Sequence, residues 1–358
     1  MLFQYEYVDD NVKLMHECMK YLVKDFWCNA SGDFDVDLIT DDKLKDMIIR
    51  LYNNPQVKKD HLYAPIKSIY EKFAQLSEIQ KNTIAQFFDM NNSIQELFED
   101  KSRIYMDFND LKKIDEDLSK EIHKFFESIY TDVIHLKDVK DILNSSMDRH
   151  YKKFIKKNTE LCPFCGLHLL EFGGNLPKEA YDHFLSKGDF PFTSINLKNL
   201  APMCNRCNSS YKLKKNPIAK NGKRVKAFYP YGGNDIDIGV DVSLQTKKIE
   251  TLSQKDVNVE LKTLKYKEEV ESWDRVFRIK DRYKQKVSSK LGAKAWLDEV
   301  NTAINRKDNP YTIDEYIELL EENQKSNPLS KDYLWEVPFI KECKRKGILR
   351  DLQEVDII

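Results

Sequence analysis

The sequence has no apolar run close to the roughly 20 residues that a membrane-spanning helix needs. Its first residues, Met1 to Glu6, also lack the basic start and apolar core of a secretory signal peptide. Internal repeats, low-complexity linkers and a G-x-x-x-x-G-K-[ST] loop are absent as well. These absences predict a cytoplasmic chain with no membrane partner. Any nucleotide-driven regulation would have to come from another chain.

Cysteine is scarce, with seven in 358 residues, and four of the seven form two C-x-x-C pairs. So few cysteines argue against a disulfide framework and for a metal site in a reducing compartment. The pairs are Cys162 with Cys165 and Cys204 with Cys207, and two such pairs complete a tetrahedral Zn²⁺ site. The alternative is four buried free thiols. The 38 residues between the pairs exceed the spacing of a zinc ribbon, so we interpret them as an insertion that carries the chemistry.

The length predicts two or three domains. Helical periodicity dominates the first part of the chain, as in Leu44, Met47, Ile48 and Leu51 after a cap at Thr40 to Asp42. The expected fold class is mainly α with a small α+β core. The expected domains are a helical domain over residues 1–150, a zinc-bound domain around the cysteine pairs over 151–235, and a C-terminal hairpin plus helical region over 236–358.

The C-terminal region contains two alternating segments and then a long helical pattern. Asp237 to Leu244 and Val257 to Leu264 predict two strands of a hairpin, and Glu268 to about Arg306 predicts one helix. No residue pattern there points to a chemical activity.

Charge is distributed unevenly along the chain, although the net charge is only -1. From Tyr151 to Pro230 there are 13 lysines and two arginines against five acidic residues, a local charge of +10, so the remainder carries -11. Such asymmetry predicts that the middle of the chain meets a polyanion. A solvated lysine-rich surface is the alternative, and coincidence with the cysteine motif favours nucleic acid.

Between the cysteine pairs, the pattern predicts a strand at Tyr181 to Leu185 and a second strand at Phe192 to Leu197. A turn at Cys204 and a helix to about Lys215 then follow. The chain also carries Asp182-His183, then Asn199, and then Asn208 directly after the last cysteine. This order resembles the HNH endonucleases, whose active site is a ββα-metal finger. The resemblance covers residues 160–216. Asn208 occupies the position of the last histidine in the H-N-H pattern.

The residues also predict the chemistry without the family name. Phosphodiester hydrolysis needs a deprotonated water and a cation that stabilises charge on the phosphate. His183 has an ordinary pKa near ~6.5 and suits the role of base. Asp182 and the Asn208 carbonyl offer oxygen ligands for catalytic Mg²⁺ or Mn²⁺. The resemblance further implies that Asn199 holds the His183 loop, although both asparagines could be turn or cap residues.

Basic residues continue after the motif with no acidic residue among them, and we expect five of them to contact nucleic acid: Lys212, Lys214, Lys215, Lys223 and Arg224. A solvated basic loop is the alternative.

Two functions remain open. The first is a metal-dependent endonuclease that cuts DNA and leaves a 5′-phosphate and a 3′-hydroxyl, as the resemblance implies. The second is a zinc-stabilised nucleic-acid-binding or scaffolding module without cleavage activity. Large helical flanks on a small HNH core resemble bacterial anti-phage defence effectors, some of which are governed by a regulatory ATPase chain.

Overall fold

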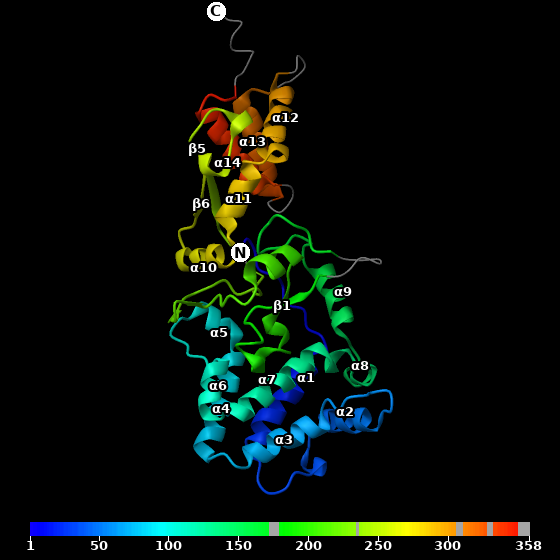
Figure 1. Cartoon of the computed structure of the whole chain (residues 1–358). Coiled ribbons are helices and arrows are strands. Elements are labelled where there is room, and N and C mark those ends of the chain that lie inside the picture. The colour runs from blue at the N-terminus through cyan, green and yellow to red at the C-terminus, as the bar shows by residue number, and fades with distance from the viewer. Residues whose placement is uncertain (172–178, 234–235, 306–310, 328–331, 350–358) are drawn as a thin grey trace, which may run out of the picture. The chain divides into compact units, whose positions relative to one another are not determined.

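The structure, a computed structural model, describes residues 1–171, 179–233, 236–305, 311–327 and 332–349. It is 57% helical and 8% strand, which confirms the predicted class, mainly α with a small α+β core (Figure 1). The chain divides into two compact units. The larger unit contains Gln4–Glu160 and Leu169–Asn234, and the smaller unit contains Met1–Phe3, Leu161–His168 and Asp235–Ile358. Within the described ranges, no helix combines the length and the apolar character that a membrane span requires.

The larger unit is built mostly of helices that precede the predicted nuclease motif. They are α1 (Lys13–Tyr21), α2 (Asp42–Asn53), α3 (Tyr63–Phe73), α4 (Glu78–Asn92), α5 (Ile94–Glu99), α6 (Phe108–Ile114), α7 (Glu116–Thr131), α8 (Lys137–Leu143) and α9 (Met147–Lys157). A side-chain cap in the local sequence explains where α2, α4, α6, α7 and α9 begin. Asp41, for example, accepts a hydrogen bond from Leu44 N–H at 2.8 Å and caps α2 within the predicted cap segment. The four apolar positions predicted for this helix are all buried.

The core of the larger unit includes residues of the predicted nuclease motif, and this changes the expected domain division. Tyr181, Phe192 and Leu200 belong to the same buried cluster as side chains of α1 to α4 and of α6 to α9. A domain boundary at residue 150 is therefore absent from the structure. The physical reason is size, because two strands of three residues cannot bury a core of their own. The division into units also falls near residue 235, and it assigns Leu161–His168 to the smaller unit.

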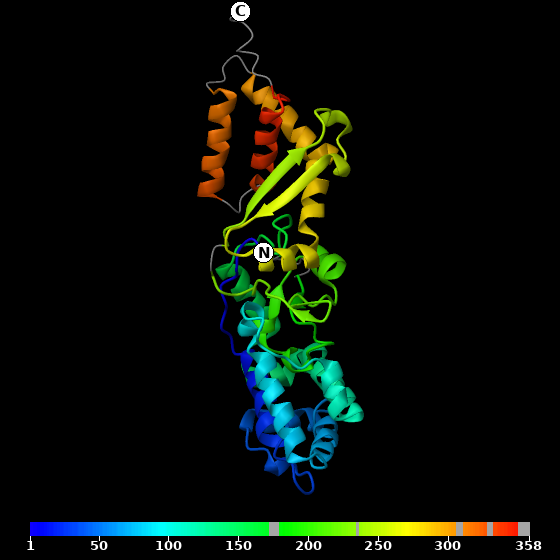
Figure 2. The same cartoon turned by 90° about the vertical axis from the view of Figure 1, so that its left-hand side faces the viewer.

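The smaller unit contains the predicted hairpin, β5 (Gly239–Leu244) and β6 (Val257–Lys262), whose antiparallel register pairs Val242 with Val259 (Figure 2). Its side chains alternate between exposed and buried along β5, and helices cover the apolar face. The helices of this unit are α10 (Lys267–Phe277), α11 (Ile279–Val287), α12 (Ala295–Ile304), α13 (Ile313–Ser326) and α14 (Tyr333–Arg345), of which α14 packs on β5 and α11 on β6.

The prediction of one helix from Glu268 to Arg306 was wrong. The chain leaves the helical conformation at Arg278, which has a left-handed φ of 53°, and again at Gly292, whose φ of -97° and ψ of -110° are not helical. A Cβ on Gly292 would lie 2.3 Å from the Lys286 carbonyl oxygen, so this bend requires glycine. Apolar periodicity continued through both bends, which is why the pattern did not reveal them.

Candidate functional site

The predicted nuclease motif lies on a short antiparallel pair and the turns that follow it. The strands are β1 (Tyr181–His183) and β2 (Leu200–Pro202), with Asp182 opposite Ala201 and His183 opposite Leu200. The predicted second strand at Phe192 to Leu197 was wrong, because a 3-10 turn starts at Pro191 and the strand begins only at Leu200. The helix after the last cysteines is a single π-helical turn, Cys207–Lys212, shorter than predicted.

His183 is held in one tautomer by a backbone carbonyl. Its Nε2 lies 2.8 Å from the Ser194 carbonyl oxygen, which can only accept, so Nε2 carries the hydrogen and Nδ1 keeps a lone pair. The ring also packs edge-on against Tyr130, with the centroids 4.3 Å apart. Burial lowers the pKa of His183 to about 3, and the nearby ammonium groups of Lys187 and Lys212 act in the same direction. The imidazole is therefore neutral at physiological pH.

Asn199 fixes the backbone immediately after His183. Its side chain is fully buried, accepts from Leu185 N–H at 2.7 Å and donates to the Leu185 carbonyl at 2.9 Å. The same amide donates to Thr193 Oγ1 at 3.0 Å, and Phe184 N–H donates to the Asn199 carbonyl at 2.9 Å. These bonds tie both ends of the loop between β1 and β2. They are the contacts through which Asn199 would hold the His183 loop.

Asp182 is paired with a lysine that we predicted to contact nucleic acid. Lys212 Nζ lies 3.0 Å from Asp182 Oδ2, with side-chain exposures of 1% and 5%, and also donates to the His183 carbonyl at 2.8 Å. Burial raises the pKa of Asp182, and Lys212 offsets part of that rise. The nucleic-acid role predicted for Lys212 does not fit this structure, because its ammonium is buried and already satisfied.

Asn208, the predicted second oxygen ligand, is half-buried in the π-helical turn that also carries Lys212. Its N–H donates to the Cys204 carbonyl at 3.1 Å, so its backbone continues the turn that the cysteines start. The turn ends at Leu213, whose φ of 51° is rare for a bulky side chain and costs backbone energy. The chain thus changes direction sharply at Leu213, directly after the buried Lys212.

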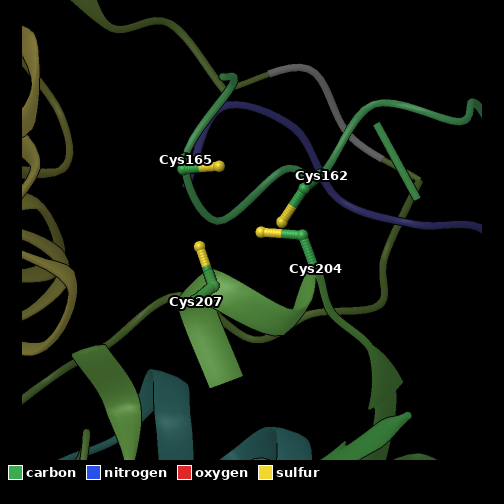
Figure 3. Close-up of side chains that lie close together, drawn as sticks. All are labelled: Cys162, Cys165, Cys204 and Cys207. Atoms are coloured by element: carbon green, nitrogen blue, oxygen red, sulfur yellow. The ribbon is translucent and has the colours of Figure 1, made fainter. Parts of the chain in front are cut away.

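The four motif cysteines form one buried cluster (Figure 3). Their sulfur atoms all lie within 4.8 Å of one another, and none of the four is in a disulfide. A tetrahedral zinc with bonds of about 2.3 Å would separate its sulfurs by about 3.8 Å. The cluster is therefore close to the geometry that zinc requires and could hold a zinc ion.

The first cysteine turn has the backbone of a metal knuckle. Gly166 N–H donates to the Cys162 carbonyl at 2.8 Å, and Leu167 N–H points at Cys165 Sγ from 3.4 Å. Gly166 has a φ of +63°, and a Cβ there would lie 2.2 Å from Leu2 Cδ1. The positive φ favours glycine in this turn, which lets a backbone amide approach a sulfur.

The other predicted nucleic-acid residues are separated by the structure. Lys214 and Lys223 are exposed, and Lys215 is half-buried. Arg224 does not fit its predicted role, because its guanidinium donates to the carbonyls of Leu97 at 2.5 Å and Ile218 at 2.7 Å. These hydrogen bonds join Arg224 to the backbone of two other segments of the larger unit.

Comparison with protein-family models, with curated proteins and with solved structures finds no match for this chain. The HNH resemblance therefore depends on the motif residues alone. Sequence reasoning missed the contacts that Tyr130, Ser194 and Lys212 make with the motif. Of these, Lys212 carried a signal, since it lies about one turn after Asn208 and shares its helical face.

Proposed function

We propose that this chain is a metal-dependent endonuclease of the HNH type that hydrolyses phosphodiester bonds in DNA. The observation that carries the proposal is the state of His183, a neutral imidazole whose Nε2–H is committed to the Ser194 carbonyl. Its Nδ1 lone pair would then accept a proton from water, and the lowered pKa makes it a weaker base than the ordinary imidazole on which the prediction rested. Asn199 holds the loop on which this imidazole depends.

The proposal includes two kinds of metal ion. Zinc would be held by Cys162, Cys165, Cys204 and Cys207, and would stabilise the fold around the motif. Mg²⁺ or Mn²⁺ would be held by Asp182 and Asn208, whose carboxylate and amide oxygens are the donors that these ions prefer. A catalytic ion of this kind neutralises charge that develops on the phosphate.

The residues of the chain have separate parts in this proposal. His183 removes a proton from the attacking water, and the Ser194 carbonyl keeps the ring oriented during that transfer. Lys212 contacts both the carboxylate of Asp182 and the carbonyl of His183, so it would keep these two residues in a fixed relative position. Lys214 and Lys223 are exposed and would contact phosphates of the substrate.

One observation favours the alternative function, a zinc-stabilised nucleic-acid-binding or scaffolding module. Lys212 already neutralises Asp182, which reduces the attraction of that carboxylate for a divalent ion. The setting of anti-phage defence, with a separate ATPase chain as partner, rests on the resemblance of the helical flanks to defence effectors.

Plasmid cleavage in Mg²⁺ and in Mn²⁺ tests the proposal. We expect His183→Ala to bind DNA like the parent while its cleavage rate falls roughly 10²- to 10⁴-fold, because the base is removed and the surface lysines remain. The matched control is His135→Ala, since His135 is exposed in another part of the larger unit. Cleavage at the parent rate by pure His183→Ala protein would refute the endonuclease and leave the binding module.

A further inference from the structure

A small basic hairpin follows the predicted nuclease motif in the larger unit. Its strands are β3 (Ala219–Lys220) and β4 (Lys223–Arg224), joined by Asn221 and Gly222 with φ of 49° and 74°. Two consecutive positive φ values define a type I′ turn, which suits the twist of a two-stranded ribbon and favours Asn-Gly. The dipeptide was a signal for this hairpin that the sequence analysis did not use.

The tip of the hairpin carries two positive charges directly opposite each other. Lys220 pairs with Lys223 in the register, and both side chains are exposed, as are the two turn residues. Like charges at opposed positions destabilise a strand pair. No aspartate or glutamate occurs anywhere from residue 190 to residue 234, and the Asp100 carboxylate interacts with Arg224 at the base of the hairpin. A polyanion would supply a compensating charge at the tip.

Arg224 anchors the hairpin to α5 and the segment after it. Besides its bonds to Leu97 and Ile218, the guanidinium donates from Nε to the Arg103 carbonyl at 3.1 Å and lies 5.2 Å from the centre of the Tyr105 ring. Burial lowers the pKa of this arginine, in keeping with an internal position. The base of the hairpin is thus fixed while its tip stays in solvent.

The same helix connects the hairpin to the catalytic histidine. Ala227 N–H, just after β4, donates to the Phe98 carbonyl in α5 at 3.1 Å. The Phe98 ring stacks on Phe184, with centroids 5.0 Å apart and planes 22° apart. Phe184 directly follows His183. The hairpin and the imidazole therefore belong to one packed set of side chains, which fixes the position of the tip relative to the imidazole.

We infer that the β3–β4 hairpin is the element that binds duplex DNA, with Lys220 and Lys223 against the phosphates and the ribbon in the major groove. This inference rests on the proposed function, since it specifies the substrate of the same site as double-stranded DNA. A major groove about 12 Å wide admits a two-stranded ribbon. The anchor through Arg224 would then set which phosphodiester bond lies near His183.

Binding measurements in the His183→Ala background test the inference without cleavage of the probe. We expect Lys220→Gln/Lys223→Gln to weaken binding to a short DNA duplex about 10- to 60-fold at 0.1 M salt and to reduce the salt slope by up to about two ions. The matched control is Lys43→Gln/Lys58→Gln, which removes the same charge from two exposed lysines elsewhere in the larger unit. We expect that control to bind within about twofold of the parent, since distant exposed charges are screened.

A second variant tests the shape of the tip. Gly222→Val keeps all charges but places a β-branched residue at a φ of +74° in open solvent, so it should distort the turn and not the core. We expect it to weaken duplex binding and to leave single-strand binding unchanged. Duplex affinity of the lysine variant equal to that of the control would overturn the inference, and so would equal losses on duplex, single-stranded DNA and RNA. Because these outcomes do not depend on cleavage, they are independent of the His183→Ala test of the proposed function.

Discussion

Lys212→Met is the substitution that most directly tests the electrostatics of the site. Methionine keeps the length and apolar stem of the side chain but removes the ammonium beside Asp182. The carboxylate then stays at 5% exposure without its counter-ion, and the His183 carbonyl loses the donor that lies 2.8 Å away. The variant therefore combines an unpaired buried charge with a lost hydrogen bond.

The expected cost is large because the pair is buried. Removing one partner of a buried ion pair costs about 3–5 kcal/mol, mainly through the charge that remains. Asp182→Asn added to Lys212→Met removes that charge, and we expect the double variant to recover about half of the loss. The double variant should accordingly be roughly 2 kcal/mol more stable than Lys212→Met alone.

The loss should also depend on pH. Burial already holds the pKa of Asp182 above its ordinary value, and loss of Lys212 raises it further. A carboxyl whose folded pKa is raised binds its proton more tightly in the folded state, so its protonation stabilises the fold as pH falls. The deficit of Lys212→Met should therefore be greatest near pH 8 and should shrink toward pH 5.

Urea unfolding of the zinc-loaded protein by circular dichroism gives the global free energy, and hydrogen exchange at residues 181–185 gives the local one. The control is Lys43→Met, an exposed lysine whose loss should cost less than about 0.5 kcal/mol. A Lys212→Met cost below about 1 kcal/mol, or a double variant no more stable than the single one, would refute the buried pair. Unchanged stability with weaker DNA binding would restore Lys212 to the surface role first predicted for it.

Two further predictions concern the cysteines and the half-buried His16. Elemental analysis should find one zinc per chain. Cys204→Ser should lose both the zinc and the folded motif, because structural zinc supplies an apparent binding free energy of ~10–16 kcal/mol in small peptides. A zinc-free parent protein would contradict this prediction. Burial, helped by Lys20 and Lys198, lowers the pKa of His16 to about 4. The unfolded chain therefore binds a proton that the folded one does not between pH ~6.5 and 4, and stability should fall by roughly 2–3 kcal/mol from pH 7.5 to 4.5 on account of this residue. His16→Gln should flatten that part of the urea-unfolding pH profile, and an unaltered profile would show that His16 is not the group responsible.

Local signals in the sequence were sufficient for the features that depend on near neighbours. The cap at Asp41 and the apolar spacing after it predicted α2, because a cap and a helical face are set within a few residues. Alternation predicted β5 and β6 for the same reason. The C-x-x-C spacing predicted each cysteine turn, since a knuckle is also a local turn, whereas the meeting of the two turns spans 38 residues.

The tertiary structure alone decided which basic residues are free to meet a polyanion. Lys212, Lys223 and Arg224 belong to one basic run, yet only Lys223 is exposed. Lys212 finds its partners about 30 residues back in the chain, and Arg224 donates to Leu97, which lies 127 residues away. A charged side chain is tolerated in the interior only when a partner there replaces its water. That partner is brought near by folding, so no spacing within the run could distinguish a buried lysine from an exposed one.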